Sequence, residues 1–530
     1  MKLLGLSISG DHDWNMSYFD GETVKYHKFE RTKQVKRFAH NNCWEWILEV
    51  KNVFGVNVED IDQIGIEFDA YEFYDVNNLP EEFLEVYRGE TLTFKLRDEI
   101  NPFKPYGVDN VYFVSHHYAH ALSSWMLEEK EPNVSVVIDG LGDLRTWTVY
   151  KNDAVVDMGL QIRGSIGYGM RDAGKWLGIK YRTDHDVAGK VMGLQSYGCQ
   201  DSGFLKYLNN FNIDNLIEIF SPQTYVEYNK DPLLAQLQPL NWIKTVHDRV
   251  EELIIDLFKK HADKDDVVSY SGGVAQNVIW NTALRENFKN IIIPPHASDE
   301  GISLGVLEVL RKQNNLKKLS IKNFPYSQTD VAPNSEPSID TINLAAKFLS
   351  EGKIVGWYQG HGEVGPRALG NRSILMDPRI KDGKEKINTV KKRENYRPFG
   401  ASVLVEHCKD YFVNGLVDDF MLFTDKPIND IYPAITHVDG TCRVQTVRDL
   451  NPNFRLLLEE FYKITGCPIL LNTSLNVANK PIAGYPQNAI EFFYASEIDV
   501  MVVGNDVLIK DDRYKVGYVD AKFRPWENMV

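Results

Sequence analysis

Three histidines lie within five residues, at His116, His117 and His120, in the stretch VSHHYAHALSSW. On a helix, residues four apart share a face, so His116 and His120 would project together while His117 points elsewhere. Two imidazoles at this spacing supply half of a metal site, although an isolated pair of this kind is usually an ordinary surface or core feature. The pattern therefore needs further ligands from distant positions.

Two aspartates are the best-placed additional ligands. Asp139 ends the apolar run VSVVI, and Asp299 lies in the stretch HASDEG before a predicted helix. Folds of the α/β class place functional groups beyond the carboxyl ends of their strands. Two histidines with two carboxylates and no thiolate suit Fe(II), Mn(II) or another octahedral ion better than structural zinc.

Other residues suit the binding of anions. The stretch YSGGVAQN pairs Gly272 and Gly273 between a strand and a helix, which favours a nucleotide, although many such joints serve packing alone. Arginines are interleaved with glycine and proline in GEVGPRALGNRSILMDPR and KKRENYRPFGASV, and Arg443 and the stretch NTSLN follow. Guanidinium groups match phosphate and carboxylate oxygens in pairs, so several of them in an acidic chain indicate an anion-binding pocket.

The elements that must position these residues show an internal echo. The first copy has a strand over 3–9, the acidic turn 10–13 and strands over 14–19 and up to about 29. The second copy has the strand VSVVI, the turn 139–143, a strand over 146–150 and the turn 152–153. Asp-Gly turns between β-rich runs are hairpin signals. The echo favours a duplicated α/β domain of the actin-like plan, with chance similarity of two hairpins as the alternative.

The remaining periodicity gives the domain organisation. Helices are predicted over 242–261, from about 276 and over 302–312, with strands over 267–270 and ending at IIIPP. The region 199–240 has no strong period and is expected to be an insertion carrying loops. Because 313–340 is polar and aperiodic, we expect domains at 1–325 and 341–513, followed by a tail at 514–530.

Composition narrows the class of protein. The 530 residues carry a formal net charge of −15, which disfavours sequence-independent binding to nucleic acid. The five cysteines are scattered and never in CxxC spacing, which argues against a disulfide framework or a thiolate zinc site. No apolar run approaches the roughly 20 residues needed to span a bilayer, and no secretory leader is evident, so we expect a cytoplasmic protein without a membrane partner.

Taken together, the motifs resemble one family. The chain resembles the O-carbamoyltransferases that tailor antibiotics and nodulation factors, because it has their motifs in the same order. These are HHxxHA, VxDGxG, GKVMGL, SGGVAQN, the Asp299 loop, EVGPRALGNRS, RPFGAS, RVQTV and NTSLN. The resemblance implies an actin-like (ASKHA) N-terminal domain similar to the tRNA threonylcarbamoyl transferases. It also implies a YrdC-like C-terminal α/β domain similar to the threonylcarbamoyl-adenylate synthases.

The same resemblance implies a reaction. The C-terminal domain would convert carbamoyl phosphate and ATP, with Mg(II), into carbamoyl-adenylate, and the N-terminal domain would transfer the carbamoyl group to a hydroxyl of a small molecule, sugar or nucleoside. The residues carried over by motif are Lys391, Arg397, Arg443 and Ser474 for the phosphates, assisted by Arg367 and Arg372; His116, His120, Asp139 and Asp299 for Fe(II) or another divalent metal; and Gly272, Gly273 and Asn277 for adenosine. His12 or Asp13 would assist proton removal, and Lys190 would contact either a phosphate or a carboxylate.

The chain also departs from the family pattern. Ala188 replaces a glutamate before GKVMGL, so either Asp186 takes its place or a contact is missing. Trp14 and Asn15 stand where small residues are usual, which would reshape an acceptor pocket. Two alternatives stay open: carbamoylation of a hydroxymethylated base in nucleic acid, and a nucleotide-binding scaffold without catalysis. A homodimer is compatible with the sequence.

Overall fold

The computed structural model describes residues 1–8, 12–39, 45–70, 78–125, 131–159, 165–230 and 236–510. The predicted tail at 514–530, Cys43 and the first residues of the acidic turn lie outside the described residues. The chain forms two compact units. Unit 1 contains the described residues of 1–329 with 364–366 and 420–424, and unit 2 contains 330–363, 367–419 and the described residues from 425 onward.

The first sheet of unit 1 is built around β1. Its strand order is β3-β2-β1-β4-β6-β5, where the strands are β1 (Leu3–Ser7), β2 (Asn15–Phe19), β3 (Val24–Lys28), β4 (Gln63–Glu67), β5 (Thr93–Lys95) and β6 (Val111–Val114). Strands β1, β2 and β3 pair antiparallel, whereas β1, β4 and β6 pair parallel. The turn between β2 and β3 forms because Gly21 adopts a φ of 106° and the Asp20 carboxylate accepts the amides of Glu22 and Thr23.

The second sheet of unit 1 repeats this plan around β7. Its order is β11-β10-β7-β8-β9, with β7 (Val134–Gly142), β8 (Arg145–Lys151), β9 (Ala154–Gly159), β10 (Val267–Ser271) and β11 (Asn290–Ile292). Strands β7, β8 and β9 are antiparallel, and β7, β10 and β11 are parallel. Asn152 and Asp153 both have positive φ, as a two-residue hairpin turn requires. The shared order confirms the duplicated actin-like fold predicted from the echo.

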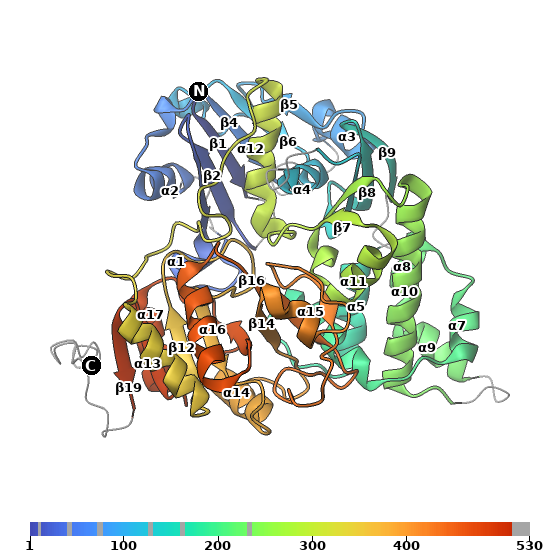
Figure 1. The fold of residues 1–530 in the computed structure, drawn as a ribbon. Coiled ribbons are helices and arrows are strands. Elements are labelled where there is room, and N and C mark those ends of the chain that lie inside the picture. The colour runs from blue at the N-terminus through green and yellow to red at the C-terminus, as the bar shows by residue number, and fades with distance from the viewer. Residues whose placement is uncertain are drawn as a thin grey trace, which may run out of the picture. The chain divides into compact units, whose positions relative to one another are not determined.

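Two helices fill the space between these sheets (Figure 1). Helix α12 (Ile302–Gln313) packs on β1 and β4, helix α4 (His116–Ser123) packs on β7, and the two helices pack on each other. Gly305 permits this contact, because a Cβ at that position would lie 1.8 Å from the Ala119 carbonyl oxygen. The other helices of unit 1 are α1 (Phe29–Lys33), α2 (Glu45–Phe54), α3 (Glu81–Arg88), α5 (Ile166–Trp176), α6 (Val187–Leu194), α7 (Ser202–Leu208), α8 (Leu216–Ile219), α9 (Pro222–Asn229), α10 (Pro239–His261) and α11 (Val278–Asn287).

The prediction of loops across 199–240 was wrong. Helices α7, α8 and α9 occupy much of this region, and Asp201 and Ser221 cap the first turns of α7 and α9. Helices this short do not extend over enough turns to give a hydrophobic period. No helix among the described residues combines the length and the apolarity needed to cross a bilayer.

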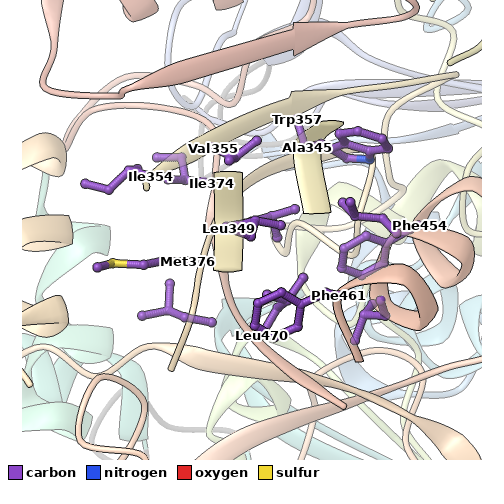
Figure 2. Close-up of a cluster of buried hydrophobic side chains, with 14 of the residues drawn as sticks. Ala345, Leu349, Ile354, Val355, Trp357, Ile374, Met376, Phe454, Phe461 and Leu470 are labelled. Atoms are coloured by element: carbon purple, nitrogen blue, oxygen red, sulfur yellow. The ribbon is translucent and has the colours of Figure 1, made fainter. Parts of the chain in front are cut away.

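Unit 2 is built on one mixed sheet. Its order is β15-β16-β14-β17-β13-β12-β18-β19, with β12 (Val355–Tyr358), β13 (Arg372–Met376), β14 (Gly400–Leu404), β15 (Thr424–Asp425), β16 (Cys442–Val447), β17 (Ile469–Ser474), β18 (Val500–Val503) and β19 (Asp506–Ile509). The helices of this part of the chain are α13 (Ile339–Ser350), α14 (Gly383–Lys391), α15 (Cys408–Tyr411), α16 (Pro452–Thr465) and α17 (Pro486–Ala495). Figure 2 shows the core, in which Trp357 of β12 and Leu470 of β17 lie with Leu349 of α13 and Phe454 and Phe461 of α16. This core fixes the sheet that carries the polar residues of unit 2.

We expect Gly305→Ala to lower the free energy of unfolding by about 1–3 kcal/mol, because the added methyl group must separate α12 from α4. Gly189→Ala in α6 is the matched control, since a Cβ there meets nothing within 4 Å. That substitution is expected to be neutral or stabilising by up to about 1 kcal/mol, because alanine favours a helix. Urea denaturation measures both, and equal effects would contradict the role given to Gly305.

Candidate active sites

The four predicted metal ligands come together in unit 1. His116, His120, Asp139 and Asp299 each offer one ligand atom, and these atoms lie within 4.8 Å of one another. The His120 Nε2 to Asp299 Oδ1 distance is 3.3 Å, and His116 Nε2 lies 3.5 Å from Asp139 Oδ2. Helix α4 supplies both imidazoles, β7 supplies Asp139, and the turn that begins α12 supplies Asp299.

Local hydrogen bonds determine where α4 begins. The Ser115 side chain caps the helix by accepting the Tyr118 amide, and Ser115 Oγ donates to the Asp143 carboxylate at 2.6 Å. Asp143, in the turn after β7, also accepts the His117 amide. The imidazole of His117 points away from the ligand cluster and meets Thr148 Oγ1 at 2.8 Å, as the helical spacing predicts.

The donor set fits a divalent metal ion. His116 Nε2 and His120 Nε2 are buried and make no hydrogen bond within the part of the chain that the structure describes. Such orphaned ring nitrogens beside two carboxylates are what a metal ion would satisfy. Imidazole and carboxylate together suit Fe(II), Mn(II) or Zn(II).

The electrostatics of this cluster favour ionised carboxylates. Burial raises the pKa of Asp139, but the nearby imidazoles of His116, His120 and His117 outweigh it, so the pKa lies well below its ordinary value. Burial lowers the pKa of His116, but Glu67, Asp139 and Asp299 raise it well above the ordinary value. The group therefore holds two carboxylates ready to receive positive charge.

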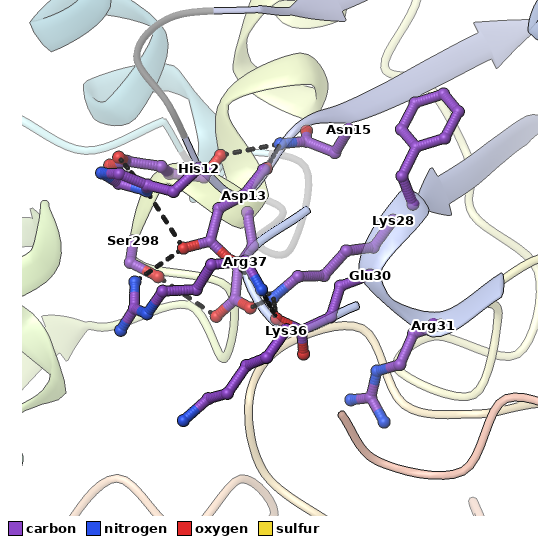
Figure 3. Close-up of polar contacts among 12 residues, drawn as sticks. His12, Asp13, Asn15, Lys28, Glu30, Arg31, Lys36, Arg37 and Ser298 are labelled. Atoms are coloured by element: carbon purple, nitrogen blue, oxygen red, sulfur yellow. Dashed lines mark hydrogen bonds and ion pairs between the residues drawn. The ribbon is translucent and has the colours of Figure 1, made fainter. Parts of the chain in front are cut away.

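The first acidic turn adjoins this cluster, and Figure 3 shows its His12 and Asp13 with the basic side chains of Lys28 and Arg37. His12 Nδ1 lies 3.2 Å from Asp13 Oδ2 and 3.6 Å from Asp299 Oδ2. Asp13 is paired with Lys28 Nζ at 3.0 Å and with Arg37 at 2.8 Å. Burial raises the pKa of Asp13, but these two cations hold it well below its ordinary value. Of the two residues predicted to remove a proton, Asp13 is engaged with cations, which leaves His12 as the better base.

The residues that depart from the family pattern have structural roles here. Trp14 is buried and stacks on Trp46 with ring centroids 5.0 Å apart. The buried Asn15 donates to the Asp299 carbonyl oxygen and accepts the Ser303 amide, so it fixes the first turn of α12. Both side chains have partners inside the protein, and the expectation that they reshape an acceptor pocket stays a prediction.

The segment around Ala188 is tied to the acidic turn by Arg37. Asp186 accepts Lys36 Nζ at 2.6 Å and lies 4.0 Å from Arg37 Nε, while Arg37 also pairs with Asp13. Lys190 donates its Nζ to the Lys180 carbonyl oxygen. Asp186 thus organises basic side chains: burial raises its pKa, but Lys36, Arg37 and Lys190 lower it.

The glycine loop after β10 is packed closely against β7. A Cβ on Gly272 would lie 2.3 Å from the Ile138 carbonyl oxygen, and the Gly273 amide donates to Asp139 Oδ1 at 2.6 Å. Asn277 caps α11 and its Nδ2 meets His247 Nε2 at 3.0 Å. The loop therefore orients the ligand Asp139, and the Asn277 side chain is occupied by capping.

Unit 2 gathers arginines of like charge. Burial and the neighbouring guanidinium groups of Arg367 and Arg397 hold the pKa of Arg443 well below its usual range. Burial, Arg397 and Arg443 do the same to the pKa of Arg393, which the sequence analysis did not single out although it lies in KKRENYRPFG. The Nε atom of Arg443 is buried and makes no hydrogen bond within the described residues. Cations held together in this way are suited to polyanions.

A buried polar network positions these arginines. Asn472 Nδ2 on β17 donates to Ser402 Oγ and to the Ala368 carbonyl oxygen, and Gln445 Nε2 on β16 donates to the Leu369 carbonyl oxygen. The register places Arg443 and Asn472 on either side of Gly400, so their side chains share one face of the sheet. The loop after Arg367 is therefore fixed to the strand that carries Arg443.

A buried carboxylate shapes the same loop from its other end. Glu363 Oε1 accepts the amides of Leu369, Asn371 and Arg372 at 2.8, 2.9 and 3.2 Å. This explains why EVGPRALGNR folds back on itself without regular structure. The glycines and proline give Arg367 a constrained backbone, as the sequence indicated.

Lys391 and Ser474 are also brought together. Lys391 Nζ lies 3.1 Å from Ser474 Oγ and donates to the carbonyl oxygens of Ser474 and Asn476 at 2.5 and 3.0 Å. Lys391 ends α14, and Ser474 ends β17 two residues beyond Asn472. Ser474 thus lies on the same face of the sheet as Asn472 and Arg443.

The role predicted for Arg372 was wrong. Its guanidinium group is fully buried and donates to the Asp330 carboxylate at 2.9 Å and to the carbonyl oxygens of Gln359, Gly360 and Ala483. It also stacks over the Tyr358 ring at 3.7 Å. Because all five of its donors are engaged within unit 2, Arg372 supports the fold and has no donor left for a phosphate.

Sequence comparison identifies the family. The model for the carbamoyltransferase N-terminus matches residues 2–307, and the model for the carbamoyltransferase C-terminus matches residues 346–510. The chain belongs to the carbamoyltransferase family.

Two nodulation proteins are similar over most of the chain. Nodulation protein NolNO of Sinorhizobium fredii is 30% identical over 448 residues, which are 76% of this chain and 64% of that protein. Nodulation protein NolO of Bradyrhizobium diazoefficiens is 30% identical over 434 residues, which are 74% of this chain and 78% of that protein. The chain thus spans a little under two thirds of the length of NolNO.

Solved structures resemble the chain more distantly. HypF from T. kodakarensis is 13% identical, with 60% of this chain and 48% of that chain covered and a TM-score of 0.37. An activator of 2-hydroxyisocaproyl-CoA dehydratase from Clostridium difficile is 14% identical, with 60% and 100% covered and a TM-score of 0.35. TM-scores this low carry no argument about the fold, so the actin-like assignment rests on the strand order of the two sheets. The likeness of unit 2 to threonylcarbamoyl-adenylate synthases stays a prediction.

We expect the purified chain to carry a divalent metal ion that His120→Ala loses and His117→Gln retains. Both histidines are buried on α4, but only His120 directs a ring nitrogen toward Asp299, whereas His117 bonds Thr148. Elemental analysis by mass spectrometry after dialysis measures the metal content. Equal metal contents in the two variants would contradict the site.

We expect inorganic pyrophosphate to raise the melting temperature of the chain, and Arg443→Met to abolish this rise without lowering stability in its absence. The first effect follows because bound anion at 100 times Kd stabilises the folded state by about 2.7 kcal/mol. The second follows because removing Arg443 relieves repulsion from Arg367 and Arg397. Arg448→Met is the control, since Arg448 is half-exposed and pairs with Asp419. A response to pyrophosphate that Arg443→Met leaves intact would contradict the cluster.

Proposed function

We propose that the chain is an O-carbamoyltransferase that forms carbamoyl-adenylate from carbamoyl phosphate and ATP and transfers the carbamoyl group to an alcohol. Water and carbamoyl phosphate give carbamate and phosphate; carbamate attacks the α-phosphate of ATP, releasing pyrophosphate. The alcohol oxygen then bonds to the carbamoyl carbon while the bond to AMP breaks. The proton of the hydroxyl group is lost in that step.

The arginine cluster of unit 2 is the observation that carries the proposal. Carbamoyl phosphate and ATP repel each other, so a site for both must offset several negative charges. The cluster lowers the pKa values of two of its members, Arg393 and Arg443, and its other members are Arg367 and Arg397. Such repulsion costs stability in the absence of a ligand, which a binding role explains and a purely structural role does not.

The fixed donors in unit 2 would bind different phosphate groups. Lys391 and Ser474, which already meet through Nζ and Oγ, would hold one phosphate group, and the arginines would hold the other phosphates. Mg(II) would accompany ATP. Because Glu363, Asn472 and Gln445 fix the backbone of this region, the cations need little reorganisation during the reaction.

The cluster in unit 1 would serve the transfer step. His116, His120, Asp139 and Asp299 would hold a divalent metal ion, which would polarise the carbamoyl carbonyl group. His12 would accept the proton of the alcohol, since its Nδ1 already lies beside Asp13 and Asp299. Asp13 would remain ionised and orient His12, because Lys28 and Arg37 hold its charge.

Two partial reactions test this assignment. Exchange of labelled pyrophosphate into ATP should require carbamoyl phosphate and no alcohol, and Arg397→Ala should lower its rate about 100-fold or more. Arg448→Ala, which removes a half-exposed arginine paired with Asp419, should leave the rate unchanged. His120→Ala should retain exchange but lose transfer of labelled carbamoyl to an alcohol.

The acceptor is found by supplying labelled carbamoyl phosphate to separate pools of sugars, nucleosides, nucleic acids and other alcohols, with mass spectrometry as the readout. Exchange that proceeds without carbamoyl phosphate would refute the adenylate step. Label found only in nucleic acid would favour the alternative acceptor over the small-molecule one.

A further inference from the structure

The His116 imidazole is held on two sides before any metal ion is considered. Its Nδ1 lies 2.9 Å from Glu67 Oε1, and because a carboxylate only accepts, Nδ1 carries the proton and donates. On another side the ring meets the backbone of β7: a Cβ on Gly142 would lie 2.1 Å from His116 Cδ2. The ring therefore cannot turn without a clash or the loss of this bond.

Glu67 is itself fixed. It is the last residue of β4, and it is fully buried. Ser7 Oγ donates to Glu67 Oε2 at 3.1 Å, and the two residues are direct partners in the parallel pairing of β1 with β4. The carboxylate is thus set by the central strands of the first sheet, whereas His116 lies on the helix packed against the second sheet.

The neighbouring histidines show that this arrangement is specific to one ring. His117 Nδ1 meets the hydroxyl group of Thr148 at 2.8 Å, which is a neutral partner, and its ring faces away from the cluster. His120 makes no ring hydrogen bond within the described residues. Of the two candidate ligand imidazoles, His116 is the one whose second ring nitrogen, Nδ1, donates to a carboxylate.

We infer that Glu67 is a positioning residue for the metal ion, acting through His116. It fixes the tautomer in which the Nε2 lone pair faces Asp139 and Asp299, and its charge makes Nε2 a stronger donor. The inference rests on the metal-binding part of the proposed function and on no step of the carbamoyl chemistry. Glu67 lay outside every motif used in the sequence analysis, since an isolated glutamate at the end of a strand carries no signal of its own.

The test measures the affinity for Mn(II) alone, by electron paramagnetic resonance of the free ion, in the metal-depleted full chain without carbamoyl phosphate, ATP or alcohol. Glu67→Gln keeps the size of the side chain and an acceptor oxygen but removes the charge. We expect it to raise the Kd for Mn(II) by about 10–100-fold. Thr148→Val is the matched control: it removes the equivalent bond from the His117 ring and should leave the Kd unchanged.

A second variant keeps the inference testable if Glu67→Gln folds poorly. Ser7→Ala leaves the charge of Glu67 in place and removes only the bond that anchors its carboxylate, so a smaller rise in the Kd is expected. Wild-type affinity in folded Glu67→Gln, or in Ser7→Ala if only that variant folds, would overturn the role of Glu67 while leaving the metal site intact. Absence of Mn(II) binding by the wild-type chain would overturn both.

Discussion

The contact between α4 and α12 is the constraint on which the candidate metal site of unit 1 depends. Neither helix holds a complete set of ligands: α4 supplies two imidazoles, and the turn before α12 supplies one carboxylate. The helices approach closely because Gly305 has no side chain to separate them from Ala119. Asn15 then fixes the first turn of α12, and Asp143 fixes the first turn of α4, so both helix starts are set by residues of the flanking sheets.

The two units differ in whether their cations are paired with carboxylates or gathered beside other cations. In unit 1 the buried Lys28 and the partly buried Arg37 each lie against carboxylates, so the network around Asp13 is balanced within the protein. In unit 2, by contrast, burial and neighbouring guanidinium groups lower the pKa values of Arg393 and Arg443. A balanced network stabilises geometry, whereas an unbalanced one stores repulsion that an anionic ligand can relieve.

Much of the architecture could be predicted from the sequence, for identifiable reasons. The hairpins of both sheets were visible because Asp20-Gly21 and Asn152-Asp153 are residues that their turns require. The spacing of His116 and His120 indicated a shared helix face, and the structure places them together with Asp139 and Asp299. The short helices in 199–240 were missed because one or two turns leave no period to detect.

Other features lacked a local signal altogether. The partners of Trp14 and Asn15 inside the protein, Trp46 and Ser303, could not be predicted from the position of these two residues in a motif. Glu67 meets His116 across a sequence separation of 49 residues, and Arg372 meets Asp330 across 42. Such pairings depend on how strands and helices are arranged, which residue types and spacing do not specify.

The buried ion pair between Arg372 and Asp330 has a consequence for how a shared signature is interpreted. Arg367 and Arg372 lie five residues apart in EVGPRALGNRS and look equivalent in any comparison of letters, yet one faces a cluster of like charge and the other neutralises a carboxylate inside the sheet. A homologue that kept Arg372 and had lost Arg367 would keep the ion pair that supports the fold. Under the proposed function, active and inactive homologues would therefore differ at Arg367 and its neighbours, and the signature as a whole would not separate them.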